Sequence, residues 1–300
     1  MTDVLRNKTV DAYTTFAAFL TMDTMRIRYA MRLTSRIGED MINAKQTIGQ
    51  IARSEPAAIE VFRSQGIQYC CHGKEEIASA SKTVGISAGG LLTKIYQAKE
   101  ASCDSRGPWV DPILEVLILH LVRSRETMMN SDLPHIAALA RSLAQCGDQV
   151  QPHAVELAMV VEALAREIGL HLAKEETWLF PLIQKIELAY VGKSVSAVPP
   201  RTFHRRVGKM VHQHEEIGHL LSAAHRLTDG YEASSSCCAP YRELCKKLKA
   251  LDSEVQEEVH LENNVLFNRA LQFSDALWPR AADDSALRKA SRAASSCRSL

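Results

Sequence analysis

Apolar side chains recur at alternating intervals of three and four residues through much of the second half of the chain. This spacing is typical of a helix face that packs against a core. The stripe of the last such segment consists of Leu244, Leu248, Leu251, Val255, Glu258, Glu262 and Val265. Two of its positions therefore hold carboxylates where a buried helix face normally holds leucine. Burial of a carboxylate is costly unless it is paired or binds a metal, so the pattern predicts a buried polar site.

Four long helices are predicted, at about 112–145, 153–188, 202–227 and 240–272. The loops between them contain clusters of Gly, Ser and Pro, which are typical of chain reversals. Four long helices with moderate loops predict a four-helix bundle, a fold whose metal sites are built from inward-facing side chains.

A smaller helical unit precedes the bundle. Short helices are expected near 48–54, 56–65, 74–82 and 90–99, with Cys70 and Cys71 in the turn before the third. The segment that follows is rich in Ser, Gly and Pro and is typical of a linker. The predicted domain order is an unstructured extension at 1–43, a small helical domain at 44–100, a linker at 101–111, the bundle at 112–273, and an unstructured tail at 274–300.

Composition agrees with an all-α protein. Of 300 residues, 46% are hydrophobic and only 6% aromatic, and the 14 glycines and 10 prolines are clustered. The net charge of +1 gives no reason to expect nucleic acid or an acidic membrane as a partner. The sequence contains no run of 18 apolar residues, so no membrane-spanning helix is predicted. The first 40 residues lack the long apolar core of a secretory signal, and eight cysteines, two pairs of them adjacent, favour a reduced cytoplasmic setting.

The other three long helices also carry polar residues on their apolar stripes. His171 and Glu175 share the inward face of the second helix, and His214 lies on that of the third. On the first helix a regular stripe through Leu133 and Met129 reaches Glu126, whereas Arg125 falls off it. The candidate metal ligands are Glu126, His171, Glu175, His214, Glu258 and Glu262.

This donor set suits two ions of iron, with manganese as the alternative. Carboxylates bridge hard cations and imidazoles suit borderline ones. Zinc is disfavoured because the set has no thiolate and more than four ligands. A single inward histidine would more often be an ordinary core residue. Six polar residues at compatible depths on four helices instead predict a two-metal centre.

The adjacent thiols of Cys70 and Cys71 form a second candidate site. Neighbouring cysteines form a mutual disulfide only with strain, so the pair is interpreted as thiol chemistry. Lys74 and His72 are expected to lower a thiol pKa electrostatically. The alternative is a structural turn that buries two small apolar side chains.

Four motifs resemble one known family, the iron–sulfur cluster repair di-iron proteins. Residues 69–74, Tyr-Cys-Cys-His-Gly-Lys, are similar to its Tyr-Cys-Cys-Gly-Gly-Lys motif. Residues 171–181 resemble its hemerythrin-type His-x-x-x-Glu segment, which continues to Leu-Phe-Pro. Residues 212–221 resemble its third-helix segment, and 259–267 its closing motif. The resemblance covers about 45–273 and implies a hemerythrin-like up-down bundle after the Cys-Cys domain.

The resemblance also implies a function. Such proteins restore iron–sulfur clusters damaged by oxidative or nitrosative stress, act in the cytoplasm, and are commonly homodimers. Their partners are the proteins that carry the damaged clusters, and Cys70 and Cys71 would act on cluster or iron. The resemblance leaves two alternatives: a di-iron enzyme that reduces nitric oxide or oxygen or oxidises ferrous iron, and a hemerythrin-like oxygen-binding or sensing protein.

The chain departs from the family at two ligand positions. The family has His where this chain has Glu258, and His on the first helix where an ungapped alignment places Glu126. A shift of one residue would place Arg125 there. Two outcomes follow: a carboxylate-rich centre with altered redox behaviour, or weakened metal binding. The His72 side chain also replaces the family's glycine in the Cys-Cys turn.

Overall fold

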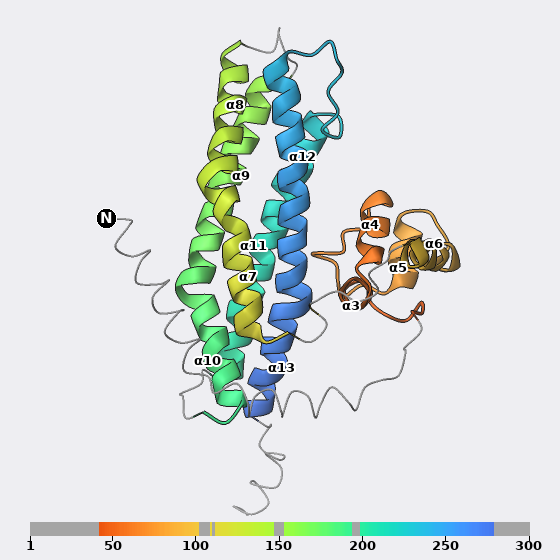
Figure 1. Ribbon diagram of the computed structural model, residues 1–300, viewed down its shortest axis with the longest axis vertical. Coiled ribbons are helices and arrows are strands. Elements are labelled where there is room, and N and C mark those ends of the chain that lie inside the picture. The colour runs from red at the N-terminus through yellow and green to blue at the C-terminus, as the bar shows by residue number, and fades with distance from the viewer. Residues whose placement is uncertain (1–41, 102–108, 110–111, 147–152, 194–198, 279–300) are drawn as a thin grey trace, which may run out of the picture. The chain divides into compact units, whose positions relative to one another are not determined.

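The computed structural model describes residues 42–101, 109, 112–146, 153–193 and 199–278 (Figure 1). These residues are helical apart from turns and one isolated β-bridge between Thr47 and Glu76. The predicted all-α class is confirmed. The predicted linker and the two predicted unstructured ends lie largely outside the described residues.

The small N-terminal unit is built around buried apolar side chains of four short helices. They are α3 (Ile48–Ser54), α4 (Ala57–Ser64), α5 (Ile77–Thr83) and α6 (Ala88–Ala101). The first begins with a capping box, in which the Thr47 hydroxyl accepts the Gln50 N–H and the Gln50 side chain accepts the Thr47 N–H. Ile51, Phe62 and Ile77 are fully buried in the core of this small unit.

Four long helices form the bundle, and consecutive ones run in opposite directions (Figure 1). Three of them contain a π-helical turn. The first helix is α7 (Leu114–Thr127), η1 (Met128–Asp132) and α8 (Leu133–Cys146), and the second is α9 (Ala154–Lys174), η2 (Glu175–Leu179) and α10 (Phe180–Tyr190). The third is α11 (Pro200–Leu227), and the fourth is α12 (Ala239–His260), η3 (Leu261–Leu266) and α13 (Phe267–Leu277). None of the described helices is both long enough and apolar enough to span a membrane.

The apolar interior is divided into two clusters with a polar layer between them. One cluster contains Ile168, Ile217 and Val255 together with the core of the small unit. The other contains Leu121, Phe180 and further buried apolar residues of the four bundle helices. The side chains between the two clusters are polar, and all three π turns lie beside this layer. Turns of this kind are frequent at functional sites.

The π turn η1 changes which face of the first helix is buried. A regular helix stepping back from Leu133 would bury residue 129 and then Glu126. The wider turn makes one step along the buried face five residues long, so the buried position before Leu133 is Met128, and the one before that is Arg125. Arg125 is therefore buried, and the prediction that Glu126 points inward is wrong because Glu126 is exposed.

The C-terminal boundary also differs from the expectation. The bundle was predicted to end at residue 273, but α13 continues to Leu277. Ser274 is completely buried and belongs to the packed part of this helix. The remaining domain boundaries stay predictions.

A buried carboxylate fixes the start of the first bundle helix. Glu187 of α10 accepts hydrogen bonds from the backbone N–H groups of Leu114 at 2.9 Å and Glu115 at 3.1 Å. These N–H groups have no partner within their own helix. Burial raises the pKa of Glu187 to about 7, although the two hydrogen bonds oppose the shift.

We predict that Glu187 makes folding stability depend on pH. Its folded-state pKa lies above the value of about 4.3 expected for an unfolded chain, so the folded state binds the proton more tightly. Its contribution to the free energy of unfolding is therefore largest below about pH 4 and is lost as pH rises through 7. Urea denaturation should show a smaller loss of stability between pH 5 and 8 for Glu187→Gln than for the wild type.

The matched control for this measurement is Glu60→Gln, at an exposed glutamate of α4. This variant should follow the wild-type pH dependence. Identical pH curves for wild type and Glu187→Gln would contradict the assignment.

Candidate metal centre

Four buried side chains from three helices converge in the polar layer. His171 comes from the last turn of α9 and Glu175 from the first position of η2. His214 comes from α11 and Glu262 from η3. Each has one potential ligand atom within 4.8 Å of those of the other three. None is more than 3% exposed, so the donor set is screened from water.

The spacing of these atoms suits a single ion. The Nε2 atoms of His171 and His214 are 2.9 Å apart. Glu175 Oε1 lies 3.4 Å from the first and 4.0 Å from the second, and Glu262 Oε2 lies 3.1 Å from His214 Nε2. Ligand atoms about 2.1 Å from a shared transition-metal ion are themselves roughly 3–4 Å apart. The donors are thus spaced like the corners of one coordination shell.

Both imidazoles are held in the neutral form that a metal ligand requires. Burial lowers the pKa of His171 to about 4 and that of His214 to about 3. The Nδ1 atom of His214 lies 2.9 Å from the Oδ1 atom of Asn263. Since that oxygen can only accept, His214 carries its proton on Nδ1 and turns the lone pair of Nε2 inward. Such outer partners orient metal-binding histidines in known sites.

One buried oxygen supports the fit to a cation. Neither oxygen of Glu175 has a hydrogen-bond partner among the described residues, although the side chain is completely buried. Oε2 lies in an ion pair with Arg125, whereas Oε1 faces the histidines. Burial raises the pKa of Glu175. An unpartnered buried carboxylate oxygen that faces two neutral imidazole nitrogens is costly. A metal ion placed between them would satisfy all three atoms, so the residues present fit a metal.

Arg125 is the one buried cation among the described residues around this layer. Its side chain is 2% exposed, and its Nη1 lies 3.0 Å from Glu175 Oε2. Its Nη2 pairs with Glu262 Oε1, and its Nε lies 3.4 Å from Glu258 Oε2. The face of the Phe180 ring packs 5.3 Å from the guanidinium carbon. The first helix therefore contributes a permanent positive charge where an acidic ligand was predicted.

Glu258 faces the site but lies outside the four-residue cluster. Its side chain is 12% exposed and contacts Arg125, and it accepts a hydrogen bond from the Ser124 hydroxyl at 3.2 Å. Burial raises its pKa to about 7, with the Arg125 charge opposing the shift. Of the six predicted ligands, His171, Glu175, His214 and Glu262 are thus brought together, Glu258 pairs with Arg125, and Glu126 is not part of the site.

The Cys-Cys turn is connected to the fourth bundle helix by hydrogen bonds. The side-chain amide groups of Asn263 and Asn264 donate to the backbone carbonyls of Cys70 at 3.2 Å and Tyr69 at 3.1 Å. Asn263 thereby joins the Cys70 backbone to the His214 ring. The Asn264 amide also lies 3.0 Å from Nδ1 of His260. A continuous polar chain therefore links the turn to a candidate metal ligand.

The two thiols of the turn are not equivalent. Cys70 is buried and its S–H points to Cys71 Sγ at 3.7 Å, whereas Cys71 is partly exposed. The hydrogen bond from Cys70 lowers the pKa of Cys71 and raises that of Cys70, which burial raises further. The largest cause of the lowered Cys71 pKa is thus the neighbouring thiol rather than the Lys74 and His72 charges expected from the sequence.

Sequence reasoning missed four residues that shape the site. Arg125 was set aside because it fell off a regular stripe, and only the extra residue of η1 brings it inward. His260 lies outside the stripe of candidate ligands, and its ring is buried with its centroid 5.4 Å from that of Tyr69. The Asn263-Asn264 pair was noted only as part of a motif. Two adjacent amides on a helix beside predicted ligands were the signal that could have indicated a second layer of contacts.

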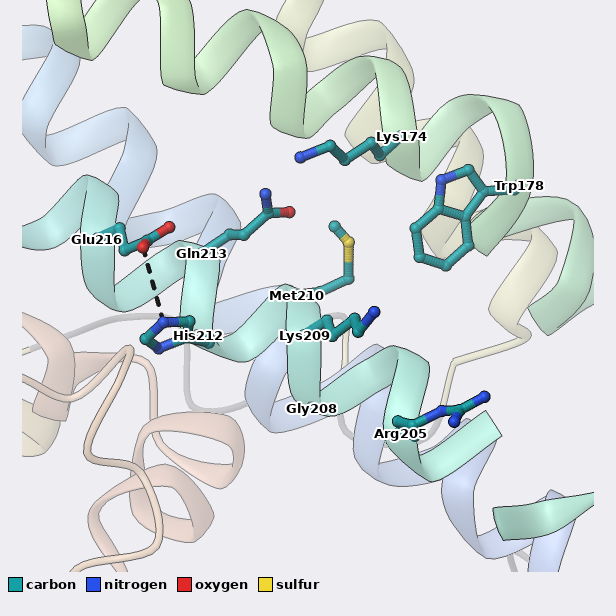
Figure 2. Close-up of a pocket in the computed structure, with 9 residues that line it drawn as sticks. All are labelled: Lys174, Trp178, Arg205, Gly208, Lys209, Met210, His212, Gln213 and Glu216. Atoms are coloured by element: carbon teal, nitrogen blue, oxygen red, sulfur yellow. Dashed lines mark ion pairs between the residues drawn. The ribbon is translucent and has the colours of Figure 1, made fainter. Parts of the chain in front are cut away.

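A surface pocket of 780 Å³ lies outside this buried cluster (Figure 2). Lys174 and Trp178 approach it from the second bundle helix, and Arg205, Lys209 and Gln213 from α11. Figure 2 shows the Lys174 and Gln213 side chains directed toward the same space, with the Trp178 ring at its edge. Its lining includes none of the four clustered residues, but Gln213, which lines it, hydrogen-bonds the His171 ring.

Comparison with known proteins gives two domain matches. Residues 44–99 match the model of the ScdA_N domain, described as a domain of unknown function. Residues 127–270 match the model of the hemerythrin HHE cation-binding domain. The second match and the buried His/Glu cluster agree on a metal-binding bundle.

Three similar proteins each cover about three quarters of this chain and nearly all of their own length. A protein of Pectobacterium atrosepticum is 25% identical over 227 residues, which is 76% of this chain and 97% of the relative. One of Edwardsiella ictaluri is 28% identical over 224 residues, or 75% and 96%. One of Yersinia pestis is 26% identical over 227 residues, or 76% and 97%. All three are named iron–sulfur cluster repair protein YtfE.

We predict that the metal-free protein depends on Arg125 for stability. In Arg125→Met, the buried carboxylates of Glu175 and Glu262 and the partly buried one of Glu258 lose their positive partner. Removing one member of a buried ion pair typically costs about 3–5 kcal/mol. Urea denaturation at pH 8 with a chelator should show a loss of this size, and the loss should shrink at acidic pH as the carboxylates take up protons.

Arg123→Met is the matched control, because Arg123 is exposed two residues earlier on the same helix. Its effect should stay within about 0.5 kcal/mol. Equal stability of the two variants would contradict the role assigned to Arg125.

We also predict that Cys71 is the more reactive thiol of the pair. Its lower pKa and partial exposure give it more thiolate than Cys70 at neutral pH. Timed iodoacetamide labelling with peptide mapping should therefore modify Cys71 first. Replacing its hydrogen-bond donor, in Cys70→Ala, should slow that labelling. Faster modification of Cys70 would refute this order.

Proposed function

We propose that this chain, which belongs to the family of proteins that join an ScdA_N domain to a hemerythrin HHE domain, holds iron in its bundle and supplies it to damaged iron–sulfur clusters. The damage would come from oxidative or nitrosative stress. The partners would be proteins whose clusters have lost iron. The name shared by the similar proteins supports the reaction, and the hemerythrin match supports the bundle as the place where iron is held.

The observation that carries the proposal is the buried set of two imidazoles and two carboxylates. His171 and His214 are neutral nitrogen donors, and a Glu175 oxygen beside them lacks a hydrogen-bond partner. Nitrogen and oxygen donors of this kind suit ferrous iron, with manganese as the alternative. The bound ion would be the cargo that the protein transfers to a damaged cluster.

The Cys-Cys turn is the proposed point of contact with the damaged cluster. Thiolates are the usual ligands of iron–sulfur clusters, and Cys71 combines a lowered pKa with partial exposure. The Asn263 amide connects the Cys70 carbonyl to the His214 ring. A change in the position of the turn would therefore alter the hydrogen bond that Asn263 makes with His214, a proposed ligand of the ion. Catalytic roles for Cys70 and Cys71 belong to this proposal.

The setting of the proposed activity is the cytoplasm, where thiols stay reduced, and the active form is expected to be a homodimer. The enzymatic and oxygen-binding alternatives remain predictions. Burial of all four donors favours holding an ion over turnover, because four protein donors can complete a tetrahedral site whereas catalytic sites keep a position open.

The test is recovery of a damaged cluster enzyme. The full-length protein is loaded anaerobically with ferrous iron and mixed with a dehydratase whose [4Fe–4S] cluster was damaged by nitric oxide. Wild-type protein should restore dehydratase activity. His171→Ala/His214→Ala should retain little iron and restore little activity, while His135→Ala, at an exposed histidine, should match the wild type.

Two outcomes would count against the proposal. Full repair by the His171→Ala/His214→Ala variant would remove the bundle from the reaction. Unchanged repair by a stably folded Cys70→Ser/Cys71→Ser variant would remove the thiols from it while leaving the bundle in place. Circular dichroism of each variant separates loss of function from loss of fold.

A further inference from the structure

The two carboxylates of the centre each face in two directions. Glu175 turns Oε1 toward the two histidine nitrogens and Oε2 toward Arg125 Nη1. Glu262 likewise turns Oε2 toward His214 Nε2 and Oε1 toward Arg125 Nη2. Each carboxylate is thus shared between a histidine side and an arginine side. Carboxylates shared in this way normally bridge two cations.

The arginine side already contains its cation. The guanidinium contacts the carboxylates of Glu175, Glu262 and Glu258. A guanidinium is permanently charged and donates several hydrogen bonds in a fixed plane. Its side chain is 2% exposed, so it cannot swing into water without opening the packed layer around it. A second metal ion would need the space and the oxygen atoms that Arg125 uses.

We infer that the bundle binds one divalent transition-metal ion, and that Arg125 takes the place of a second. The ion's ligands are His171, His214, Glu175 and Glu262, and Glu258 serves as a partner of Arg125. The inference rests on the proposed function for the identity of the ion as iron. It replaces the two ions predicted from the sequence with one, so each chain holds and releases one ion.

The decisive measurement is the number of ions per chain. Full-length protein is loaded anaerobically with excess ferrous iron, desalted, and analysed for iron and protein; manganese is used in parallel. We expect one ion per chain at saturation. Two ions per chain would overturn the inference and leave the proposed function standing. Absence of bound iron would overturn both, so the two failures are distinguishable.

A paired variant tests whether Arg125 sets this number. Arg125→His/Glu258→His removes the guanidinium and places two imidazoles beside the shared carboxylates. We expect its capacity to rise to two ions per chain. Arg123→His adds an exposed histidine to the same helix and should keep one ion. A folded Arg125→His/Glu258→His protein that still binds one ion would overturn the role of Arg125.

Electron paramagnetic resonance supplies a readout independent of counting and of repair. After oxidation, the wild type should show the signal of a magnetically isolated ferric ion. The Arg125→His/Glu258→His variant should instead show loss of that signal through exchange coupling of two ions. An exchange-coupled pair in the wild type would overturn the inference. If the variant fails to fold, the wild-type spectrum and metal content still decide the number of ions.

Discussion

The burial of Arg125 among three carboxylates is the interaction on which the interior of this bundle depends. The guanidinium lies in a polar layer between two apolar clusters and contacts Glu175, Glu258 and Glu262. Without a cation, each of these groups would raise the cost of folding. With Arg125 in place, the carboxylates can face the core, and Glu175 Oε1 and Glu262 Oε2 stay directed toward the histidines, where a metal could bind them.

A second constraint comes from the contact between the Cys-Cys turn and the fourth bundle helix. Gly49 and Gly73 approach the Asn264 side chain so closely that a Cβ atom at either position would collide with it. That approach allows Asn264 to reach the Tyr69 carbonyl, and Asn263 to join Cys70 to His214. The small domain therefore helps fix the tautomer of a metal ligand, which gives a structural reason for the two domains to occur together.

Much of the site followed from helical periodicity, because a regular stripe has a predictable inward face. The positions of His171, Glu175 and Glu262 follow directly from stripes of three and four residues. The prediction failed for Glu126 because η1 adds a residue between Leu133 and Arg125 and rotates the earlier part of the helix. A π turn has no clear signature in a single sequence, so the identity of the first helix's contribution could not be fixed from periodicity alone.

The sequence by itself determined the all-α class, the four long helices and the histidine-glutamate donors, since each depends on local spacing and side-chain chemistry. Tertiary structure decided which charge the first helix contributes, which oxygen of each carboxylate faces the histidines, and which atoms support them from the Cys-Cys turn. These features depend on the rotation of one helix against another and on contacts between residues nearly two hundred positions apart. Neither the rotation of a helix nor a long-range contact produces a periodic pattern in the sequence.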